Sequence, residues 1–254
     1  RGIGEREQYE GAPNPSVGFI VDDIDLSGVG GIISTFDLER IEVLRGPQSA
    51  RYGSSALAGI VFAESRAPTS ELEGRLEVTG ASDETRSLGG AAGGPLTPDL
   101  SGRLSVYKHR SDGFSTNAFL GRHDTNERDE LTVRGKLNWD FGAEWAAQLV
   151  AMYADFDNGY DAFALANSDT TLSDEPGEDS QKTKAASLRV GGQLNDVIEF
   201  LSISSAASSD VLFSYDGDWV NEQYWLPIIS DYRYTNPRQR DAFSQELRLL
   251  SRPD

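Results

Sequence analysis

Beyond residue 70 the chain alternates between apolar and polar residues in segments of about ten residues. The clearest segment is 131–141. Its alternate positions form an apolar set, Leu131, Val133, Gly135, Leu137, Trp139 and Phe141, and a polar set, Thr132, Arg134, Lys136, Asn138 and Asp140. Because successive side chains of a strand point to opposite faces, this pattern predicts a strand with one apolar and one polar face. Similar segments predict about eight strands, at 72–80, 84–94, 100–110, 131–141, 145–156, 184–194, 197–212 and 241–251.

The connections between these segments differ in length. Those near 95–99, 142–144 and 195–196 are short, whereas those near 111–128, 157–182 and 213–240 are long. Outer-membrane barrels show this asymmetry, with tight turns on the periplasmic side and long loops outside. No run of about 18 apolar residues occurs, so membrane residence would have to use strands. A soluble β-sandwich or propeller can also combine alternating strands with uneven loops, and this alternative stays open on the strand pattern alone.

The first 68 residues have a different composition, with short apolar runs interrupted by Gly and Pro, and they end at the Pro-containing stretch 66–69. Within them, residues 41–45 predict a strand. Gly46 permits a backbone conformation that other residues resist, and Pro47 fixes the next φ, so the chain is expected to turn there. A Pro at the start and Gly53 at the end, with Tyr52 before it, predict a very short helix over 47–53.

This block, Ile-Glu-Val-Leu-Arg-Gly-Pro-Gln-Ser-Ala-Arg-Tyr-Gly at 41–53, resembles the plug domain of TonB-dependent outer-membrane receptors. The upstream stretches 17–23 and 36–40 and the downstream stretch 58–62 strengthen the resemblance. It implies that residues 1–68 are the later part of a plug domain and that residues 69–254 are the first strands of the barrel. The expected fold is therefore an α+β plug remnant followed by antiparallel transmembrane β-barrel strands, in a partial, open barrel of about eight strands, since a closed eight-stranded barrel has no room for a plug.

The resemblance also implies particular contacts. Arg45 matches a family arginine that meets glutamates of the barrel wall, and Arg40 is expected to assist it. In the segment 243–249, Glu246 and Arg248 fall on the polar face, so Glu246 is expected to point inward and to pair with the plug arginine. The alternative, that Glu246 and Arg248 simply face water in the lumen, stays open.

Charge and composition exclude several functions. With 23 basic and 41 acidic residues the net charge is −18, which argues against nucleic acid as a partner. The chain has no cysteine and only two histidines, so thiolate chemistry is excluded and a histidine metal cluster is not expected. No arrangement of nucleophile, base and acid is evident, and the sequence predicts neither an enzyme nor a cofactor.

A ligand site is predicted in the long connection 213–240, which is rich in aromatic residues and arginine. The candidate residues are Tyr215, Trp219, Tyr224, Trp225, Tyr232, Arg233 and Tyr234, with Arg238 and Arg240 nearby. Rigid aromatic rings offer contact area at low entropic cost, and arginine can pair with an anionic chelate. An aromatic belt with packing inside the loop is the alternative.

The sequence therefore predicts a bacterial outer-membrane receptor for energy-coupled uptake of a ferric siderophore or a similar iron complex. Its expected partners are that ligand, the outer-membrane lipid and the TonB energy-coupling complex, which would act through a more amino-terminal part of the plug that the resemblance does not cover. Two alternatives are a receptor of the same class for cobalamin, a saccharide or another nutrient, and a secreted β-rich glycan-binding or adhesive protein. The last would bury apolar residues on both layers of a sandwich.

Overall fold

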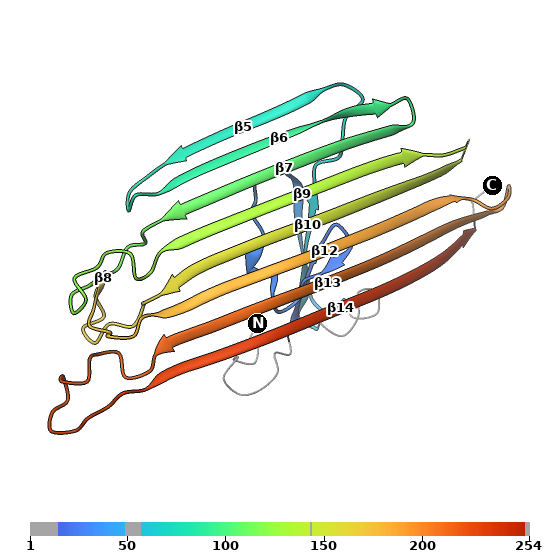
Figure 1. Ribbon diagram of the computed structural model, residues 1–254. Coiled ribbons are helices and arrows are strands. Elements are labelled where there is room, and N and C mark those ends of the chain that lie inside the picture. The colour runs from blue at the N-terminus through green and yellow to red at the C-terminus, as the bar shows by residue number, and fades with distance from the viewer. Residues whose placement is uncertain (1–14, 49–56, 143, 252–254) are drawn as a thin grey trace.

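The computed structural model describes residues 15–48, 57–142 and 144–251. Its dominant element is an eight-stranded antiparallel sheet, which we call the wall, in the order β14-β13-β12-β10-β9-β7-β6-β5 (Figure 1). The strands are β5 (Glu73–Gly80), β6 (Arg86–Thr97), β7 (Leu100–Ser111), β9 (Arg128–Asp140), β10 (Trp145–Tyr160), β12 (Gly177–Gln193), β13 (Ile198–Asp216) and β14 (Arg233–Ser251). Each strand pairs with its sequence neighbour, and β5 and β14 are the two edges. The prediction of a partial, open barrel is confirmed.

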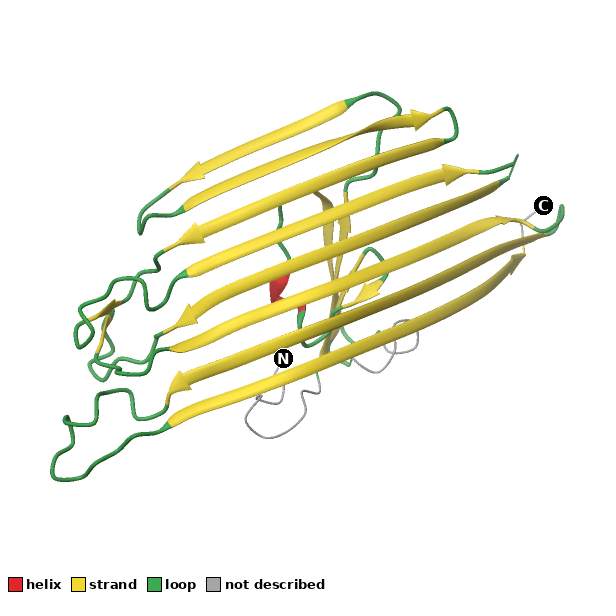
Figure 2. Ribbon diagram, viewed as in Figure 1, coloured by secondary structure: helices red, strands yellow, loops and turns green. Residues whose placement is uncertain are grey.

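A second, four-stranded sheet, the inner sheet, lies against one face of the wall (Figure 2). Its order is β2-β1-β4-β3, from β1 (Val17–Val21), β2 (Ile24–Asp25), β3 (Leu38–Arg45) and β4 (Gly59–Ser65), and a 3-10 turn, η2 (Gly30–Ile32), follows β2. The strand predicted at 41–45 is part of β3, and Gly46 has the expected positive φ, at +97°. The helix predicted over 47–53, with Tyr52 and Gly53, falls largely outside the described residues. The predicted boundary at 68/69 falls in the connection between β4 and β5.

The two faces of the wall have opposite character. The outward face carries exposed apolar side chains: Leu72, Leu76 and Val78 near one edge are 87%, 75% and 74% exposed, and Phe243, Leu247 and Leu249 on the other edge strand are also exposed. The inward residues of β9, Thr132, Arg134 and Lys136, are buried beneath the inner sheet. Alternation therefore predicted the correct face for each residue of this strand. The exposed apolar outward face is that of a membrane barrel and not that of a soluble sandwich, whose outward-facing residues are polar.

The core lies between the two sheets. Apolar residues of the inner sheet and its connections, which together we call the inner domain, pack against apolar residues of the wall. The inner domain contributes Val21, Ile24, Leu26, Val29, Ile32 and Ala63, and the wall contributes Met152, Ala154, Phe156, Ala185, Ala207 and Val211. Several wall residues here are small, which lets the inner sheet approach closely. Gly89 shows the same requirement, because a Cβ there would lie 2.6 Å from the ring of Phe36. Phe36 also stacks on Tyr107, with ring centroids 5.5 Å apart.

The strands on the long-loop side extend further than alternation predicted. β12 begins at Gly177 rather than 184, and β14 begins at Arg233 rather than 241. The predicted connection 213–240 is consequently wrong in its limits, and the loop spans only 217–232. Where a barrel strand extends beyond the lipid its outer face is polar too, so alternation disappears although the backbone pairing continues. A short parallel pair, β8 (Thr116–Asn117) with β11 (Thr170–Thr171), joins the other two long loops. Among the described residues no helix is long and apolar enough to cross a membrane.

Candidate functional site: the contact between the inner sheet and the wall

The turn between β1 and β2 presents two carboxylates to the wall. Val21 pairs with Ile24, so Asp22 and Asp23 alone form the turn, and both have positive φ, at 46° and 69°. Such two-residue turns favour Asn or Gly, and Asp tolerates the left-handed conformation less readily than Gly. Nothing in the local sequence showed that these two side chains would bind the wall.

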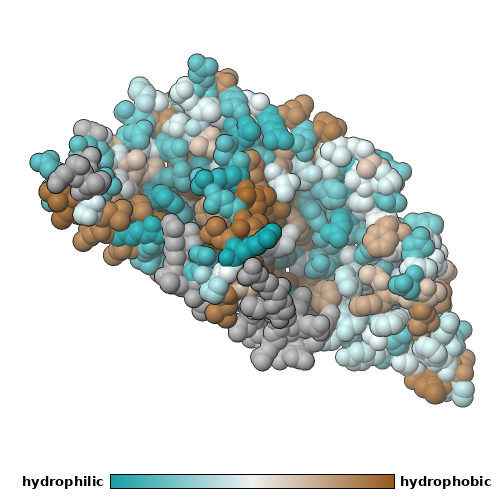
Figure 3. All heavy atoms as spheres, turned by 180° about the vertical axis from the view of Figure 1, so that it is seen from behind, coloured by the Kyte–Doolittle hydropathy of each residue, from teal (hydrophilic) through white to brown (hydrophobic). Residues whose placement is uncertain are grey.

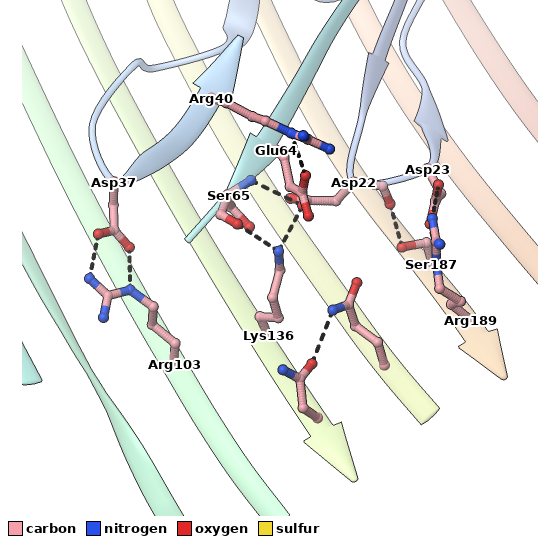
Figure 4. Close-up of polar contacts among 12 residues, drawn as sticks. Asp22, Asp23, Asp37, Arg40, Glu64, Ser65, Arg103, Lys136, Ser187 and Arg189 are labelled. Carbon is pink, nitrogen blue, oxygen red and sulfur yellow. Dashed lines mark hydrogen bonds and ion pairs between the residues drawn. The ribbon is translucent and has the colours of Figure 1, made fainter. Parts of the chain in front are cut away.

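Asp22 is the centre of a buried polar network (Figure 4). Lys136 of β9 donates from Nζ to Oδ1 of Asp22 at 2.9 Å and to the carbonyl of Ser65 at 2.7 Å. The amide of Ser65 donates to the same Asp22 oxygen, and the hydroxyl of Ser187 on β12 donates to the Asp22 carbonyl. The side chains of Lys136 and Asp22 are 3% and 1% exposed. The network therefore joins β1, β4, β9 and β12 in a volume from which solvent is excluded.

A second buried pair lies at the start of β3. Arg103 of β7 donates from Nε and Nη2 to the two oxygens of Asp37, at 2.8 and 2.5 Å, and both side chains are 2% exposed (Figure 4). Between the two aspartates, Arg134 of β9 donates to the carbonyls of Phe36 and Ser34. A bidentate arginine–carboxylate pair fixes both position and orientation, so this contact sets the register of the inner domain on the wall.

Two further pairs lie nearer to solvent. Arg189 of β12 makes a bidentate contact to Asp23, with its closest distance at 2.7 Å, and Arg240 of β14 lies 3.4 Å from Asp25. These pairs bring the acidic turn of the inner sheet into contact with strands on both sides of β13.

The prediction paired a plug arginine with a wall glutamate, but in these four pairs the charges are reversed. The carboxylates come from the inner domain and the cations come from the wall. Arg40 pairs within the inner sheet, with Glu64 at 2.9 Å and Glu42 at 3.1 Å. Glu246 pairs with Arg248 on its own strand. Arg45 is exposed at the end of β3, and within the described ranges no ion pair joins it to Glu246. Its contact with a wall glutamate stays a prediction.

Arg40, Glu246 and Arg248 nevertheless face one another across a hollow of about 730 Å³ between the inner sheet and the β13–β14 edge. The expectation that Glu246 and Arg248 lie on the inward face is in accord with this position. The basic wall residues Arg103, Lys136 and Arg189 were not singled out from the sequence. Their position on the polar face of predicted strands was visible, but nothing in the sequence showed which polar residues the inner domain would cover.

The predicted ligand residues separate into two groups. The ring centroids of Tyr215 on β13 and Tyr234 on β14 lie 5.0 Å apart. Both rings belong to a cluster that also contains Tyr160, Phe163, Phe213 and Trp219. Tyr224 and Trp225 form a separate exposed pair at the tip of the loop 217–232. Tyr232, also exposed, closes that loop, and Arg233 starts β14. Tyr160 and Phe163 were missed because they lie at the end of β10 and in the loop after it, far in the sequence from the connection 213–240.

A wall with apolar residues outside and polar residues inside, holding an inner domain by buried ion pairs, defines an outer-membrane barrel with a plug. Comparison with known proteins agrees. The model of the TonB-dependent receptor plug domain matches residues 1–60. The chain belongs to the TonB-dependent receptors of the bacterial outer membrane. Members of this family are transporters rather than enzymes.

Relatives with different ligands resemble the chain. It is 32% identical over 143 residues to the ferric enterobactin receptor PirA of Pseudomonas aeruginosa, and this alignment covers 54% of this chain and 19% of that protein. It is 23% identical over 235 residues to the vitamin B12 transporter BtuB of Vibrio vulnificus, and this alignment covers 84% of this chain and 36% of that protein. The structure superposes on the ferric yersiniabactin uptake receptor FyuA of Yersinia pestis with a TM-score of 0.79 and 21% identity, over 95% of this chain and 37% of that one. The chain thus spans well under half the length of these relatives.

Proposed function

We propose that this chain supplies the plug and part of the wall of a receptor for energy-coupled uptake of a ferric siderophore or a similar iron complex. The observation that carries the proposal is the chemistry of the plug–wall contact. A plug that must move for passage needs contacts that hold it at rest and can be exchanged for water. Buried ion pairs have this property, because the attraction between the charges is largely offset by the cost of removing them from water. When the plug moves and water enters, hydration of the two charges replaces much of the lost attraction.

In this proposal the TonB energy-coupling complex pulls on the segment amino-terminal to the inner sheet. Force on that side reaches β1 first, and through it the turn with Asp22 and Asp23. The bonds to Lys136, Ser187 and Arg189 would therefore break before the Asp37–Arg103 pair at β3. Opening would begin beside β9 and β12 of the wall.

The ligand would approach from the long-loop side and meet the aromatic cluster first. Tyr215 and Tyr234 belong to this cluster, which includes Phe213, and Arg238 follows on the same face of β14 as Tyr234. Aromatic faces beside a guanidinium suit an anionic chelate with aryl groups, and such a ligand carries its own metal ligands. Relatives named as ferric enterobactin and ferric yersiniabactin receptors support this ligand class. A corrinoid is the second candidate, since the alignment with a vitamin B12 transporter covers most of the chain.

Uptake measurements on the protein expressed from its complete gene test the proposal. In a strain deleted for the gene, we expect loss of uptake of radioactive iron from a ferric catecholate and unchanged uptake of labelled cobalamin. The double variant Tyr215→Ala with Tyr234→Ala should lower iron uptake by about thirtyfold, because stacking contributes on the order of 1 kcal/mol per ring and about 1.4 kcal/mol corresponds to tenfold. Phe243→Ala is the matched control, since this aromatic ring faces outward and is 76% exposed. Loss of cobalamin uptake with normal iron uptake would favour the second candidate.

A further inference from the structure

The outward face of the wall contains an apolar groove of about 490 Å³ across β6, β7, β9 and β10. Its floor is backbone left bare by small residues, chiefly Gly94, Gly102 and Gly135. Its sides are five leucines: Leu72, Leu96, Leu104, Leu137 and Leu149. These residues occupy the outward positions of their strands, opposite in phase to the buried Arg103 and Lys136. The groove is therefore continuous with the lipid-facing surface.

We propose that this groove is a binding site for one acyl chain of a glycerophospholipid from the periplasmic leaflet, held more tightly than the surrounding lipid. The proposal rests on the outer-membrane location of the family and not on the identity of the transported ligand. Lipid tails are as apolar as leucine, so hydrophobicity gives no preference between them, and close packing decides what stays bound. A chain lying on bare backbone between leucine side chains touches protein on three sides, which a chain on a flat wall does not.

The groove is narrow at Gly102. A Cβ added to Gly102 would lie 3.0 Å from side-chain carbons of both Leu137 and Leu96, so these two leucines lean over the backbone there. At Gly135 an added Cβ would meet no atom within 4 Å, so the groove is open above this residue. The shape is that of a channel narrowed at Gly102 and free at Gly135, which suits an extended chain rather than a bulky ring.

Aromatic rings place the groove in one leaflet. Trp139, Phe141, Trp145 and Phe200 follow one another at the short-turn end of the wall, with centroid distances of 4.8, 6.3 and 6.1 Å. Such a girdle marks a membrane interface, and short turns mark the periplasmic side. Leu137 is two residues from Trp139 on the same face, so the groove adjoins the periplasmic girdle.

A second outward hollow has a different character. It has a volume of about 670 Å³, spans β10 to β14 and is lined by charged residues that include Asp155, Asp157 and Lys182. Tyr153 donates to Asp155 at the edge of this hollow, which marks the opposite interface. Charged lining excludes an acyl chain there, because carboxylates facing hydrocarbon are costly. Of these two hollows, only the groove across β6, β7, β9 and β10 suits a lipid tail.

Native mass spectrometry of the complete receptor, purified from outer membranes in mild detergent, tests the site. We expect the wild-type protein to retain one phospholipid through a detergent wash that removes the rest. Gly135→Leu fills the groove without a clash and should lower retention by about tenfold. Gly90→Leu is the matched control: Gly90 faces outward on β6, also has no atom near an added Cβ, and does not line the groove.

Folding and transport are checked in the same samples. All three proteins should unfold at similar temperatures and support the same iron uptake, so that loss of lipid is separated from loss of fold and from failure of the proposed transport function. Equal phospholipid retention by wild type and Gly135→Leu would overturn the proposal, as would retention of none. Retention of lipid A in place of phospholipid would refute the proposed periplasmic leaflet. A dimer of the wild type that dissociates in Gly135→Leu would also refute the proposal, because the occupant of the groove would then be a second copy of the protein.

Discussion

The two faces of the wall are built from the same strands and obey opposite rules. Leu137 and Leu149 are exposed on the lipid-facing side, whereas Lys136, one residue from Leu137, is 3% exposed and bound to Asp22. Figure 3 views the molecule from the opposite side, with the inner sheet in front of the wall. In a soluble protein an apolar side chain gains by leaving water. Here it gains by meeting hydrocarbon, so the outward face is apolar, whereas the inward face carries buried polar and charged residues beside its apolar core.

The same comparison shows how the plug is held. Its apolar contact with the wall, which includes Met152 and Phe156 as well as alanines, is non-directional, so the contact that fixes its orientation is the set of carboxylates bound by wall cations. Removing one partner of such a pair leaves a charge stranded away from water, which is more costly than the pair was worth.

The largest effect is expected for Asp37→Ala. It leaves Arg103 without its carboxylate at a site that is 2% exposed, and the plug–wall contact should lose about 3 to 5 kcal/mol. Protease sensitivity of the plug in intact outer membranes is the measurement. Replacing both partners, Asp37→Leu with Arg103→Met, should recover most of the loss. Glu64→Ala, which breaks the exposed pair with Arg40, is the control, and an equal effect of both single variants would contradict the assigned role of burial.

A charge on the lipid face comes next. Leu149→Lys should destabilise the wall by about 2 to 4 kcal/mol, because the side chain lies in the apolar band between the two aromatic interfaces. Gln148→Lys changes the adjacent inward residue, in a polar hollow that is also lined by Glu144 and Glu199, and should cost much less. Urea titration in lipid vesicles compares the two. Equal costs would mean that the faces are not lipid and lumen.

A third prediction contrasts paired with unpaired carboxylates. Asp216 ends β13 at the outer loops and is buried, but unlike Asp22 and Asp37 no ion pair of the described residues includes it. Burial, with the nearby Asp218 charge, raises the pKa of Asp216 to about 6. Because the folded pKa exceeds the unfolded one, stability from this group is complete below about pH 4 and is lost as the pH rises to about 6.

Asp216→Asn should therefore leave the loop 217–232 more stable at pH 7 by about 1 to 3 kcal/mol and remove the pH dependence between 4 and 6. Hydrogen exchange of the loop amides, corrected for intrinsic rates, is the measurement. The amide oxygen of Asn can still accept from the backbone of residues 218 and 219, as Asp216 does. A loop that is less protected in the variant at pH 7 would refute the prediction.

The smallest effect is expected for Asp23→Ala. The Arg189 side chain is 44% exposed, so the pair is screened by solvent and should be worth about 0 to 1 kcal/mol. Asp23→Gly removes the same carboxylate but relieves the positive φ, and should be less harmful than alanine. The same protease assay ranks the two. A loss as large as that of Asp37→Ala would mean that solvent does not reach this pair.

Much of the fold could be predicted from the sequence, and the features that could not be predicted have a common cause. Alternation gave eight strands and the correct face for Leu131, Val133 and Leu137, because lipid selects apolar residues at every second position. It failed at the outer ends of β12 to β14, where the outward face is no longer apolar, and it therefore assigned Tyr215, Arg233 and Tyr234 to a loop. The plug motif predicted β3 and the turn at Gly46. The pairing partners of Arg40 and Glu246 were not predictable, since short-range partners on neighbouring strands compete with distant ones.

The periodicity and backbone preferences of consecutive residues are sufficient to predict strands with one apolar and one polar face after a plug-like domain. Which charges meet depends on how distant segments are arranged in the folded protein. Asp22 and Lys136 are 114 residues apart, and Asp37 and Arg103 are 66 apart. Their contact depends on strand register, on wall curvature and on small residues that admit the plug. The energy of a buried ion pair depends on excluding water, which no local pattern records.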